Sequence, residues 1–387
     1  MRHAIFLALA YLRHHRLASL ALILSVAIIA SVPVATRLVL REAEASFGAR
    51  AEATPLILGA RGSSLDLTMA SLYFTQNVAA QVTKGVEDAV WDSGLADAIP
   101  LYTGFSTRGV PVVGTSVDYF DFRQLRPDRG RSLAQIGEAV VGAAAARRLG
   151  VAPGDTIITD PRTLFDLAGA YPLELTVAGV LAPTGSADDA AVFVDVNTAW
   201  IIAGIGHGHG DVTEGPDGPT VIADPALRQF TRITPENIAS FHLHQERALL
   251  PLSAVIVVPH DARAAAILLG RYLVSDNPLS LIRPREVIAE LLQTLFRIGA
   301  LLDAVVIVLG LASSLAIALA MAQAVQLRRD ELQTLFRLGA QRAVIARVIG
   351  AQFVIIFVAG LVVAATFLLS VAFMLKEIVA ALVAAAS

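Results

Sequence analysis

Three runs of the chain are almost entirely apolar, and each is long enough to cross a membrane. Residues 304–327 and 348–375 contain no Asp, Glu, Lys or Arg. Both exceed the roughly 20 residues that span a bilayer core. A third run, residues 17–36, contains Pro33, which a membrane helix tolerates. The pattern predicts an integral membrane α-helical protein with three spans.

The N-terminal run has two interpretations. Residues 31–35, SVPVA, fit the cleavage site of a signal peptide, whose apolar stretch is about 7–15 residues long. We favour an uncleaved membrane helix, because this apolar run is longer than that. Residues 1–16 then form a separate amphipathic helix, in which apolar Phe6 and Leu9 contrast with Arg2 and the basic residues at 13–16. Such a helix lies in the plane of the lipid headgroups.

Basic residues set the orientation of the spans. Arginines precede the first span, and five more occupy residues 328–347. Because Lys and Arg concentrate in cytoplasmic loops, both segments are expected in the cytoplasm, and the long stretch between them is expected outside.

These assignments predict the following order of parts. The chain has a cytoplasmic amphipathic helix (1–16), a transmembrane helix (17–37), an extracytoplasmic α+β domain (38–283), a stalk helix (284–302), a second transmembrane helix (303–327), a cytoplasmic coupling segment (328–347), a third transmembrane helix (348–375) and a short C-terminal tail (376–387). The fold class is therefore membrane α-helical, with a large α+β domain inserted between spans 1 and 2. The stalk would carry motion of the second span into that domain.

The external stretch mixes strand and helix patterns. Apolar residues at 173, 175 and 177 alternate with polar ones, and PTGSADD then turns the chain into residues 191–196, which predicts a β-hairpin. The other expected elements are a helix over 138–149 ending at Gly150, a strand over 156–159, a glycine-rich mobile loop over 204–219, a buried strand over 253–258 and a helix over 262–273.

Composition excludes several classes of function. Hydrophobic residues make up 55% of the chain and charged residues 16%, which is typical of a membrane protein. A net charge of −3 gives no reason to expect nucleic acid as a partner, since its binding needs clustered basic residues. Cysteine is absent, which excludes disulfides and thiol chemistry.

Motifs of common enzymes are missing. The sequence has no GxxxxGK[ST] motif, so the chain is not itself an ATPase, and it has neither a GxSxG elbow nor an HExxH zinc motif. The apolar runs contain no acidic or basic residue of the kind that ion pathways use. Asp303 lies at the outer edge of the second span, where an aqueous interface explains it. We therefore expect no catalytic site.

Histidines of the external domain could suggest a metal site. The candidates are His207, His209, His242 and His244. His242 and His244 would share one face of a strand, because side chains alternate with a period of two. A tetrahedral zinc site needs ligands that converge in space, and spacing alone does not establish this. Exposed polar sequence is the simpler interpretation, so no metal is predicted.

The charged interruption at 328–347 has helical spacing. A helix over residues 328–342 would have an apolar stripe, and Gly339 would offer a break before the third span. The stripe consists of Leu332, Leu335, Phe336 and Leu338. This helix could lie against a partner protein or lipid headgroups; alternatively, the segment is a solvated basic loop. Periodicity leaves both interpretations open.

Three segments resemble a known family. RRDELQTLFRLGAQRAVIARVIGAQF (328–353) resembles the basic segment of FtsX/MacB-like ABC transporter permeases. PLILGARGSSLDLTMASLYF (55–74) resembles the segment after the first span in a subgroup near the lipoprotein-release permeases. EAVVGAAAARRLGVAPGDTI (138–157) and VAGVLAPTGSADDAAVFV (177–194) are similar to the core of the family's external domain.

The resemblance implies a mechanism. Such permeases form homodimers or heterodimers in the bacterial inner membrane and recruit a separate cytoplasmic ABC ATPase, which uses ATP and Mg²⁺; this chain binds no cofactor. Motion passes to the external domain, a mode called mechanotransmission, and an extracytoplasmic adaptor or substrate protein and membrane lipid are further partners. The coupling role maps onto Arg328, Arg329, Glu331, Leu332, Leu335, Phe336, Arg337, Gly339 and Arg342.

The leading hypothesis is the permease subunit of an ATP-driven export or extraction system for lipid-linked or envelope cargo. An ATP-coupled regulatory protein that controls an external partner without transport is the alternative, and a membrane-anchored binding protein without an ATPase is a third. The family usually has four spans and this sequence has three. The fourth is either naturally absent, removed by truncation or supplied by another polypeptide.

Overall fold

The computed structural model describes residues 2–75, 80–161, 172–208, 214–215, 218–219, 231–234, 237–243, 245–274, 276–327 and 342–386. The chain divides into two compact units. The helical unit comprises Met1–Ala45 and Leu291–Val379, and the α+β unit comprises Ser46–Glu290 and Ala380–Ser387.

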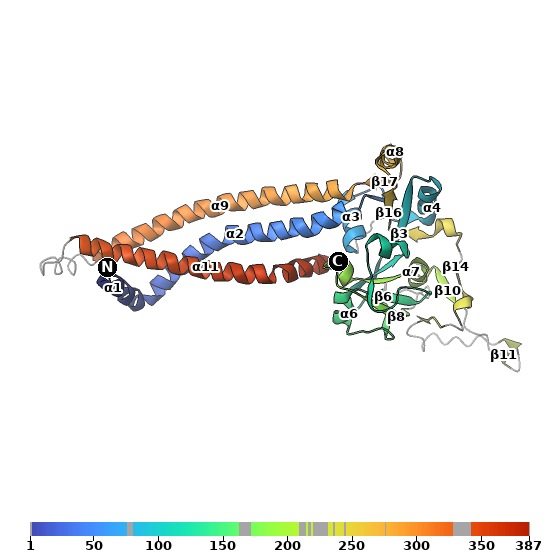
Figure 1. Cartoon of the computed structure of the whole chain (residues 1–387), viewed down its shortest axis with the longest axis horizontal. Coiled ribbons are helices and arrows are strands. Elements are labelled where there is room, and N and C mark those ends of the chain that lie inside the picture. Colours follow the sequence, from blue (N-terminus) through green and yellow to red (C-terminus); the bar gives the residue numbers. More distant parts are fainter. Residues whose placement is uncertain are drawn as a thin grey trace. The chain divides into compact units, whose positions relative to one another are not determined.

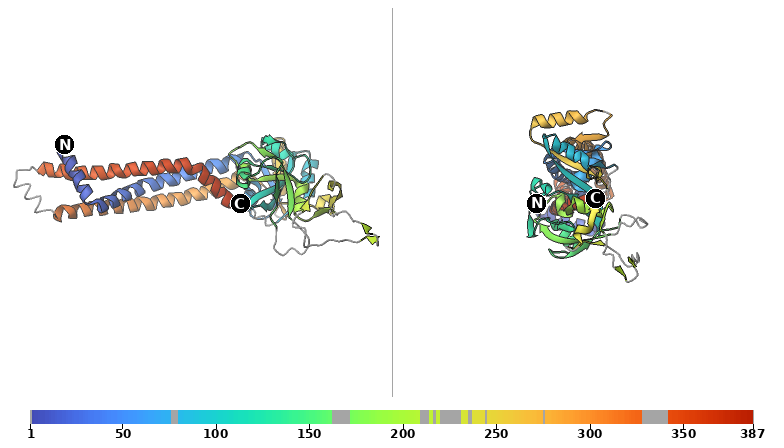
Figure 2. Two further views of the ribbon diagram at one scale, coloured as in Figure 1. Left: turned by 90° about the horizontal axis from the view of Figure 1, so that it is seen from below. Right: turned by 90° about the vertical axis from the view of Figure 1, so that its right-hand side faces the viewer.

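Long helices build the helical unit. They are α1 (Arg2–His14), α2 (Arg16–Glu52), α9 (Pro284–Leu327) and α11 (Arg342–Ala386). Within the described residues, three helical stretches are long and apolar enough to cross a membrane: Arg16–Glu52, Pro284–Ala316 and Ala346–Leu375. In Figures 1 and 2, α2, α9 and α11 run side by side. Each predicted span lies within one of these three helices, which extend beyond it.

Glycines bring these helices close together. A Cβ atom added at Gly310 of α9 would lie 3.2 Å from Ile29 Cγ2, and one added at Gly360 of α11 would lie 2.7 Å from Val26 Cβ. Small residues at such contacts allow backbones to approach, and packing of this kind holds helices together in lipid, where no hydrophobic effect drives them together. α2 is therefore the helix against which both α9 and α11 pack.

The α+β unit contains one sheet of eleven strands within the described residues. Its order is β13-β8-β6-β9-β4-β3-β16-β1-β17, and β5 and β7 also pair with β8. The strands are β1 (Leu56–Ala60), β3 (Ala96–Thr107), β4 (Val110–Thr115), β5 (Pro127–Gly130), β6 (Glu138–Val141), β7 (Thr156–Ile158), β8 (Leu173–Leu181), β9 (Val192–Asp195), β13 (Thr231–Arg232), β16 (Ala254–Pro259) and β17 (Leu279–Ile282).

Shorter elements complete this unit. Two-stranded pairs are β2 (Val82–Thr83) with β15 (Pro251–Leu252), β10 (Gly206–Gly208) with β14 (Phe241–Leu243), and β11 (Glu214–Gly215) with β12 (Gly218–Pro219). The helices are α3 (Ser64–Tyr73), α4 (Lys84–Asp92), α5 (Asp118–Phe122), α6 (Ala143–Leu149), α7 (Val196–Ile202) and α8 (Ala262–Tyr272), with 3₁₀ turns η1 (Ala187–Ala190), η2 (Ile238–Ser240) and η3 (Arg247–Leu249).

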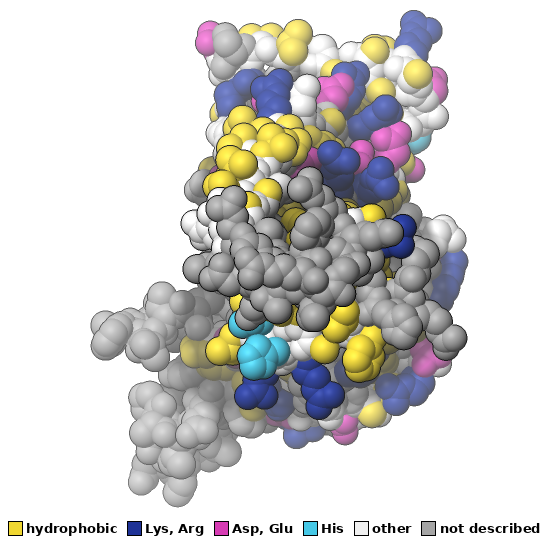
Figure 3. Space-filling view, turned by 90° about the vertical axis from the view of Figure 1, so that its left-hand side faces the viewer, with side chains coloured by type: hydrophobic (Ala, Val, Ile, Leu, Met, Phe, Trp, Pro, Cys, Tyr) yellow, Lys and Arg dark blue, Asp and Glu magenta, His cyan; other side chains and the backbone are white. Residues whose placement is uncertain are grey.

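Charged side chains of both signs share the surface. On the face drawn in Figure 3, the described Lys and Arg side chains stand in several groups, with Asp and Glu among those in the upper part and apolar side chains between them.

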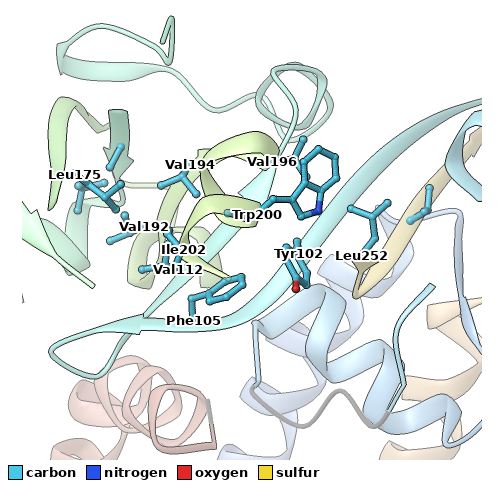
Figure 4. Packing of buried hydrophobic residues seen from close by; sticks show 14 of the residues in the cluster. Tyr102, Phe105, Val112, Leu175, Val192, Val194, Val196, Trp200, Ile202 and Leu252 are labelled. Carbon is cyan, nitrogen blue, oxygen red and sulfur yellow. The ribbon is translucent and has the colours of Figure 1, made fainter. Parts of the chain in front are cut away.

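The sheet is buried on both faces. Alternate residues of the same strand enter different core clusters: Val255 and Val257 of β16 join one cluster, whereas Ile256 joins the other. Figure 4 shows part of the first cluster, where Trp200 of α7 lies close to Tyr102 of β3. The indole Nε1 of Trp200 donates to the Pro251 carbonyl at 2.7 Å, so this fully buried ring keeps its hydrogen bond.

Several predicted elements are confirmed. The buried strand expected at 253–258 is β16, the helix expected at 262–273 is α8, and the strand expected at 156–159 is β7. Asp261 caps α8 by accepting from the Ala264 amide at 2.6 Å, and such N-caps are strongly preferred at helix starts. The loop expected at 204–219 includes β10, which pairs with β14, while residues 209–213 and 216–217 lie outside the described residues.

Two expectations for this unit were wrong. Residues 138–141 form strand β6 and not the first turn of a helix; only α6 is helical, and Gly150, in the left-handed conformation, ends it as expected. The predicted hairpin partners β8 and β9 are both strands, but they do not pair with each other. β6 lies between them, parallel to β8 and antiparallel to β9.

Candidate functional site

The C-terminal turn of α2 is anchored in the α+β unit by a buried arginine. Helix α2 continues beyond its apolar run as far as Glu52, and Arg50 lies in its last turn. The Arg50 guanidinium forms two parallel hydrogen bonds to Asp188, with Nη1 to Oδ2 at 2.6 Å and Nη2 to Oδ1 at 2.8 Å. Their side chains are 6% and 3% exposed. A bidentate pair of this kind fixes orientation as well as distance.

Other elements of the unit hold the same guanidinium. Arg50 Nε donates to the carbonyl of Leu72 in α3, and Nη2 donates to the hydroxyl of Tyr119 in α5 at 3.0 Å. The Tyr119 hydroxyl in turn donates to Asp188 Oδ1 at 2.6 Å. The last turn of α2 is thus tied to α3, α5 and η1 at once. We call Arg50, Tyr119 and Asp188 the anchor cluster.

Asp188 is fixed from its own side as well. Its amide donates to the hydroxyl of Ser186, which caps η1. The backbone of Gly142 approaches so closely that a Cβ there would lie 2.2 Å from the Asp188 carbonyl oxygen. The carboxylate therefore cannot follow Arg50 if α2 moves, unless the surrounding loop moves too.

The pKa values of Asp188 and Tyr119 in the anchor cluster are shifted in opposite directions, which fixes the charge of each group at neutral pH. Burial alone would raise the pKa of Asp188, but the Arg50 guanidinium outweighs burial and lowers this pKa to about 2. Burial and the neighbouring carboxylate raise the pKa of the Tyr119 hydroxyl above its usual value. At neutral pH, Asp188 is therefore ionised and Tyr119 remains a hydrogen-bond donor.

A second arginine supports the end of α2. Arg123 Nη2 donates to Thr54 Oγ1 at 2.7 Å, and Thr54 Oγ1 donates to the Arg50 carbonyl at 2.9 Å. The Arg123 guanidinium lies 4.7 Å from the ring centroid of Phe122, which is a cation–π distance. Its Nε is buried and has no hydrogen-bond partner among the described residues, and burial lowers the pKa of this group.

The start of α9 has a weaker link to the same turn of α2. Arg285 Nη1 lies 3.0 Å from Glu52 Oε1, and both side chains are largely exposed. An exposed ion pair contributes about 0.2–1 kcal/mol, whereas removing one partner of a buried pair costs about 3–5 kcal/mol. The buried anchor of α2 therefore dominates this junction.

The predicted coupling residues are mostly outside the described part of the chain. Residues 328–341 include Arg328, Arg329, Glu331, Leu332, Leu335, Phe336, Arg337 and Gly339, and none of them is described. Arg342 is the first residue of α11. The coupling role of this segment stays a prediction.

The candidate metal ligands are only partly described. His207 and His242 occupy directly paired positions of β10 and β14, whereas His209 and His244 lie outside the described residues. Among the residues that were described, no group of three His, Cys, Asp or Glu could hold a metal ion. The pairing brings two of the four histidines to one place, and two ligands do not make a zinc site.

The anchor cluster could not be recognised from sequence patterns. Arg50 follows the first span together with Arg37 and Arg41 and has no distinguishing motif, and Asp188 lies within the turn-like PTGSADD. Their separation of 138 residues leaves no spacing rule that would connect them. A buried ion pair of this kind depends on the tertiary fold.

A comparison with family models identifies the chain. The model of the MacB-like periplasmic core domain matches residues 17–225, which is more than half of the sequence and includes the whole anchor cluster. The chain belongs to the FtsX/MacB-like ABC permease family. The resemblance seen in the sequence motifs is confirmed.

Solved structures of similar domains have low identity. The periplasmic region of MacB from Actinobacillus actinomycetemcomitans is 11% identical, with 65% of this chain and 97% of that one covered, at a TM-score of 0.36. The extracellular domain of the noncanonic ABC-type transporter YknZ from Gram-positive bacteria is 12% identical, with 59% and 98% covered, at a TM-score of 0.34. No curated protein matches the chain.

Family membership indicates the kind of complex to which this MacB-like chain belongs. It fits an ABC transporter permease subunit, and members of the family generally pair with a cytoplasmic ABC ATPase and dimerise. Membership together with the three apolar helices indicates an inner membrane protein with a periplasmic domain of α+β fold.

Proposed function

We propose that this chain is the permease subunit of an ATP-driven ABC system for export or extraction, and that it acts by mechanotransmission. A separate cytoplasmic ATPase hydrolyses ATP with Mg²⁺, and the membrane helices carry the resulting motion to the extracytoplasmic domain. Lipid-linked or envelope molecules are the proposed cargo. The single observation that carries the proposal is that α2, a helix apolar enough to span the membrane, ends in the buried anchor cluster.

Helix continuity supports this mechanism. α2 shows no break between Arg37, where its apolar run ends, and Arg50. At 1.5 Å per residue, these 13 residues extend about 20 Å. A continuous helix transmits rotation and translation along its axis only if its far end is held. Arg50 supplies that hold through hydrogen bonds to three elements of the α+β unit.

The cytoplasmic input is proposed at the coupling segment. Residues 328–342 would present their apolar stripe to the ATPase, with Glu331, Leu335, Arg337 and Gly339 as the central contacts. The chain itself would perform no catalysis, because the sequence has no P-loop.

A paired experiment tests the input and the transmission separately. The chain is co-purified with its ATPase from membranes, and ATP-dependent release of envelope cargo is measured. Glu331→Lys with Leu335→Asp is expected to leave membrane insertion intact and abolish ATPase association. The matched control, Glu286→Lys with Leu273→Asp, makes the same exchanges at exposed residues of the α+β unit and is expected to retain association.

The outcomes separate the candidate functions. Undiminished co-purification of the coupling variant would refute the coupling assignment. Retained ATPase association and ATP hydrolysis without any cargo release would refute transport and favour a regulatory protein that controls an extracytoplasmic partner.

A further inference from the structure

A hollow of about 310 Å³ lies between α2 and α9 within the helical unit. Arg37, Leu40 and Arg41 line it from α2, and Phe296, Gly299 and Asp303 line it from α9. Its volume is within the usual range for small-molecule pockets. None of its lining residues takes part in the hydrogen bonds of the anchor cluster.

The hollow carries one unbalanced positive charge. Arg37 donates twice to Asp303 Oδ2, from Nε at 3.1 Å and from Nη2 at 2.9 Å. These two charges cancel. Arg41 lies one helical turn further along the same face of α2, is exposed, and forms no ion pair with any residue in the described part of the chain. A free guanidinium beside a second, oriented one is a good receptor for a phosphate, which accepts two parallel hydrogen bonds.

Part of the lining of the hollow is apolar. Gly299 faces Leu40 so closely that a Cβ there would lie 2.9 Å from Leu40 Cδ1. The Phe296 side chain is 39% exposed at the same place. The hollow therefore offers cationic donors next to a hydrocarbon surface, which suits an amphipathic ligand better than a free inorganic ion.

Its position along the helices points to lipid headgroups. The apolar run of α2 ends at Thr36, immediately before Arg37, and the uncharged run of α9 begins immediately after Asp303. With these runs in the bilayer core, the hollow lies at the outer headgroup level, where Arg side chains meet lipid phosphates.

We propose that this hollow binds the phosphate ester of an anionic headgroup, with Arg41 as the main contact and Arg37, oriented by Asp303, as the second. Leu40 and Phe296 contact the glycerol and the first methylene groups. This inference rests on the proposed membrane placement of α2 and α9, but it does not depend on ATP coupling.

Native mass spectrometry of the detergent-solubilised full chain tests the proposal. Phosphatidylglycerol is titrated against the wild type and the variants Arg41→Gln, Arg41→Lys and Arg297→Gln. Arg297 is the matched control, because it is an exposed arginine of α9 next to Phe296 but does not line the hollow. Loss of one charge-assisted bidentate contact is expected to weaken binding about tenfold in Arg41→Gln, with Arg41→Lys between this variant and the wild type and Arg297→Gln within about twofold of it.

Each result has a defined meaning. Equal weakening in Arg297→Gln and Arg41→Gln would show general attraction of anionic lipid and overturn the site, as would unchanged binding in Arg41→Gln. Glycerol 1-phosphate without acyl chains identifies the source: much weaker binding than the lipid supports a headgroup, and equal binding overturns the lipid source in favour of a free phosphate ester. ATPase co-purification, measured on the same preparations, is expected to be unchanged in all these variants, which keeps failure of this site distinct from failure of the proposed function.

Discussion

Removing the carboxylate charge of Asp188 should unfold the α+β unit more easily than any surface charge change. Asp188→Asn leaves the Arg50 guanidinium buried with only neutral partners, Tyr119 and the Leu72 carbonyl. Breaking a buried pair from one side costs about 3–5 kcal/mol, because the remaining charge stays desolvated. Asn keeps the shape of Asp and one acceptor oxygen, so we expect the lower part of that range, about 3 kcal/mol.

A double-mutant cycle separates the interaction energy of Arg50 with Asp188 from the other contacts of each side chain. Arg50→Met removes the charge and keeps an unbranched apolar stem, and the double variant Arg50→Met with Asp188→Asn leaves no buried ion. Because contacting residues are not additive, the double variant should be less destabilised than the sum of the single variants, by about 2 kcal/mol. In this cycle, effects of each substitution on the unfolded state cancel where the single and double variants share them.

Urea unfolding of the full chain in detergent, followed by tryptophan fluorescence, measures this cycle. The sequence has two tryptophans, and both Trp91 and Trp200 lie in the α+β unit, so the signal reports that unit. Glu52→Gln is the control, since it breaks the exposed pair with Arg285 at the same turn of α2 and should cost under about 1 kcal/mol. If Asp188→Asn costs no more than Glu52→Gln, the anchor cluster does not hold α2.

Three further predictions use the same unfolding assay. The depressed pKa of Asp188, about 2, gives stability that is present above the usual aspartate pKa near 4 and is lost as the pH falls through 2. This loss should be absent from Asp188→Asn. Burial raises the pKa of Glu87 despite the ion pair between its Oε1 and Lys84 Nζ at 3.2 Å, and among the described residues its Oε2 has no partner. Because Lys84 keeps Asp88 as a second partner at 2.6 Å, Glu87→Gln should stabilise by about 1 kcal/mol at pH 7, and the gain should vanish in acid. Gly142→Ala should cost about 1–3 kcal/mol, because its Cβ would strike the Asp188 carbonyl, whereas Gly270→Ala, with open space around it, should cost nothing.

The membrane helices could be predicted because their signal is local. A run of more than 20 apolar residues without a charge has few alternatives to a spanning helix, and α9 and α11 fulfil that expectation. Strand β16 and helix α8 were equally accessible, since each has its own periodicity and Asp261 marks the boundary between them.

Strand β6 could not be recognised in the same way. Its residues Ala139 and Val141 enter one core cluster and Val140 enters the other, so the strand is apolar on both faces. The apolar residues of such a strand show no alternation with a period of two. The pattern therefore cannot be distinguished from the beginning of the alanine-rich helix that follows it. The hairpin failed for a related reason. The end of PTGSADD forms part of η1 instead of a tight turn. Strand β6 lies between β8 and β9 in the sheet, so these two strands do not pair.

Helices α2 and α9 are anchored unequally, and this difference indicates how motion should enter the α+β unit. α2 is held by a buried bidentate pair, whereas the ion pair that Arg285 of α9 forms with α2 is exposed. Removing one partner of the first pair costs several times more than removing one partner of the second, so a force applied to both helices would break the exposed pair before the buried one. We therefore expect α2 to set the orientation of the domain and α9 to follow. On this view Arg50→Met should uncouple cargo release from ATP hydrolysis while ATPase association is retained, and Arg285→Gln should leave both unchanged.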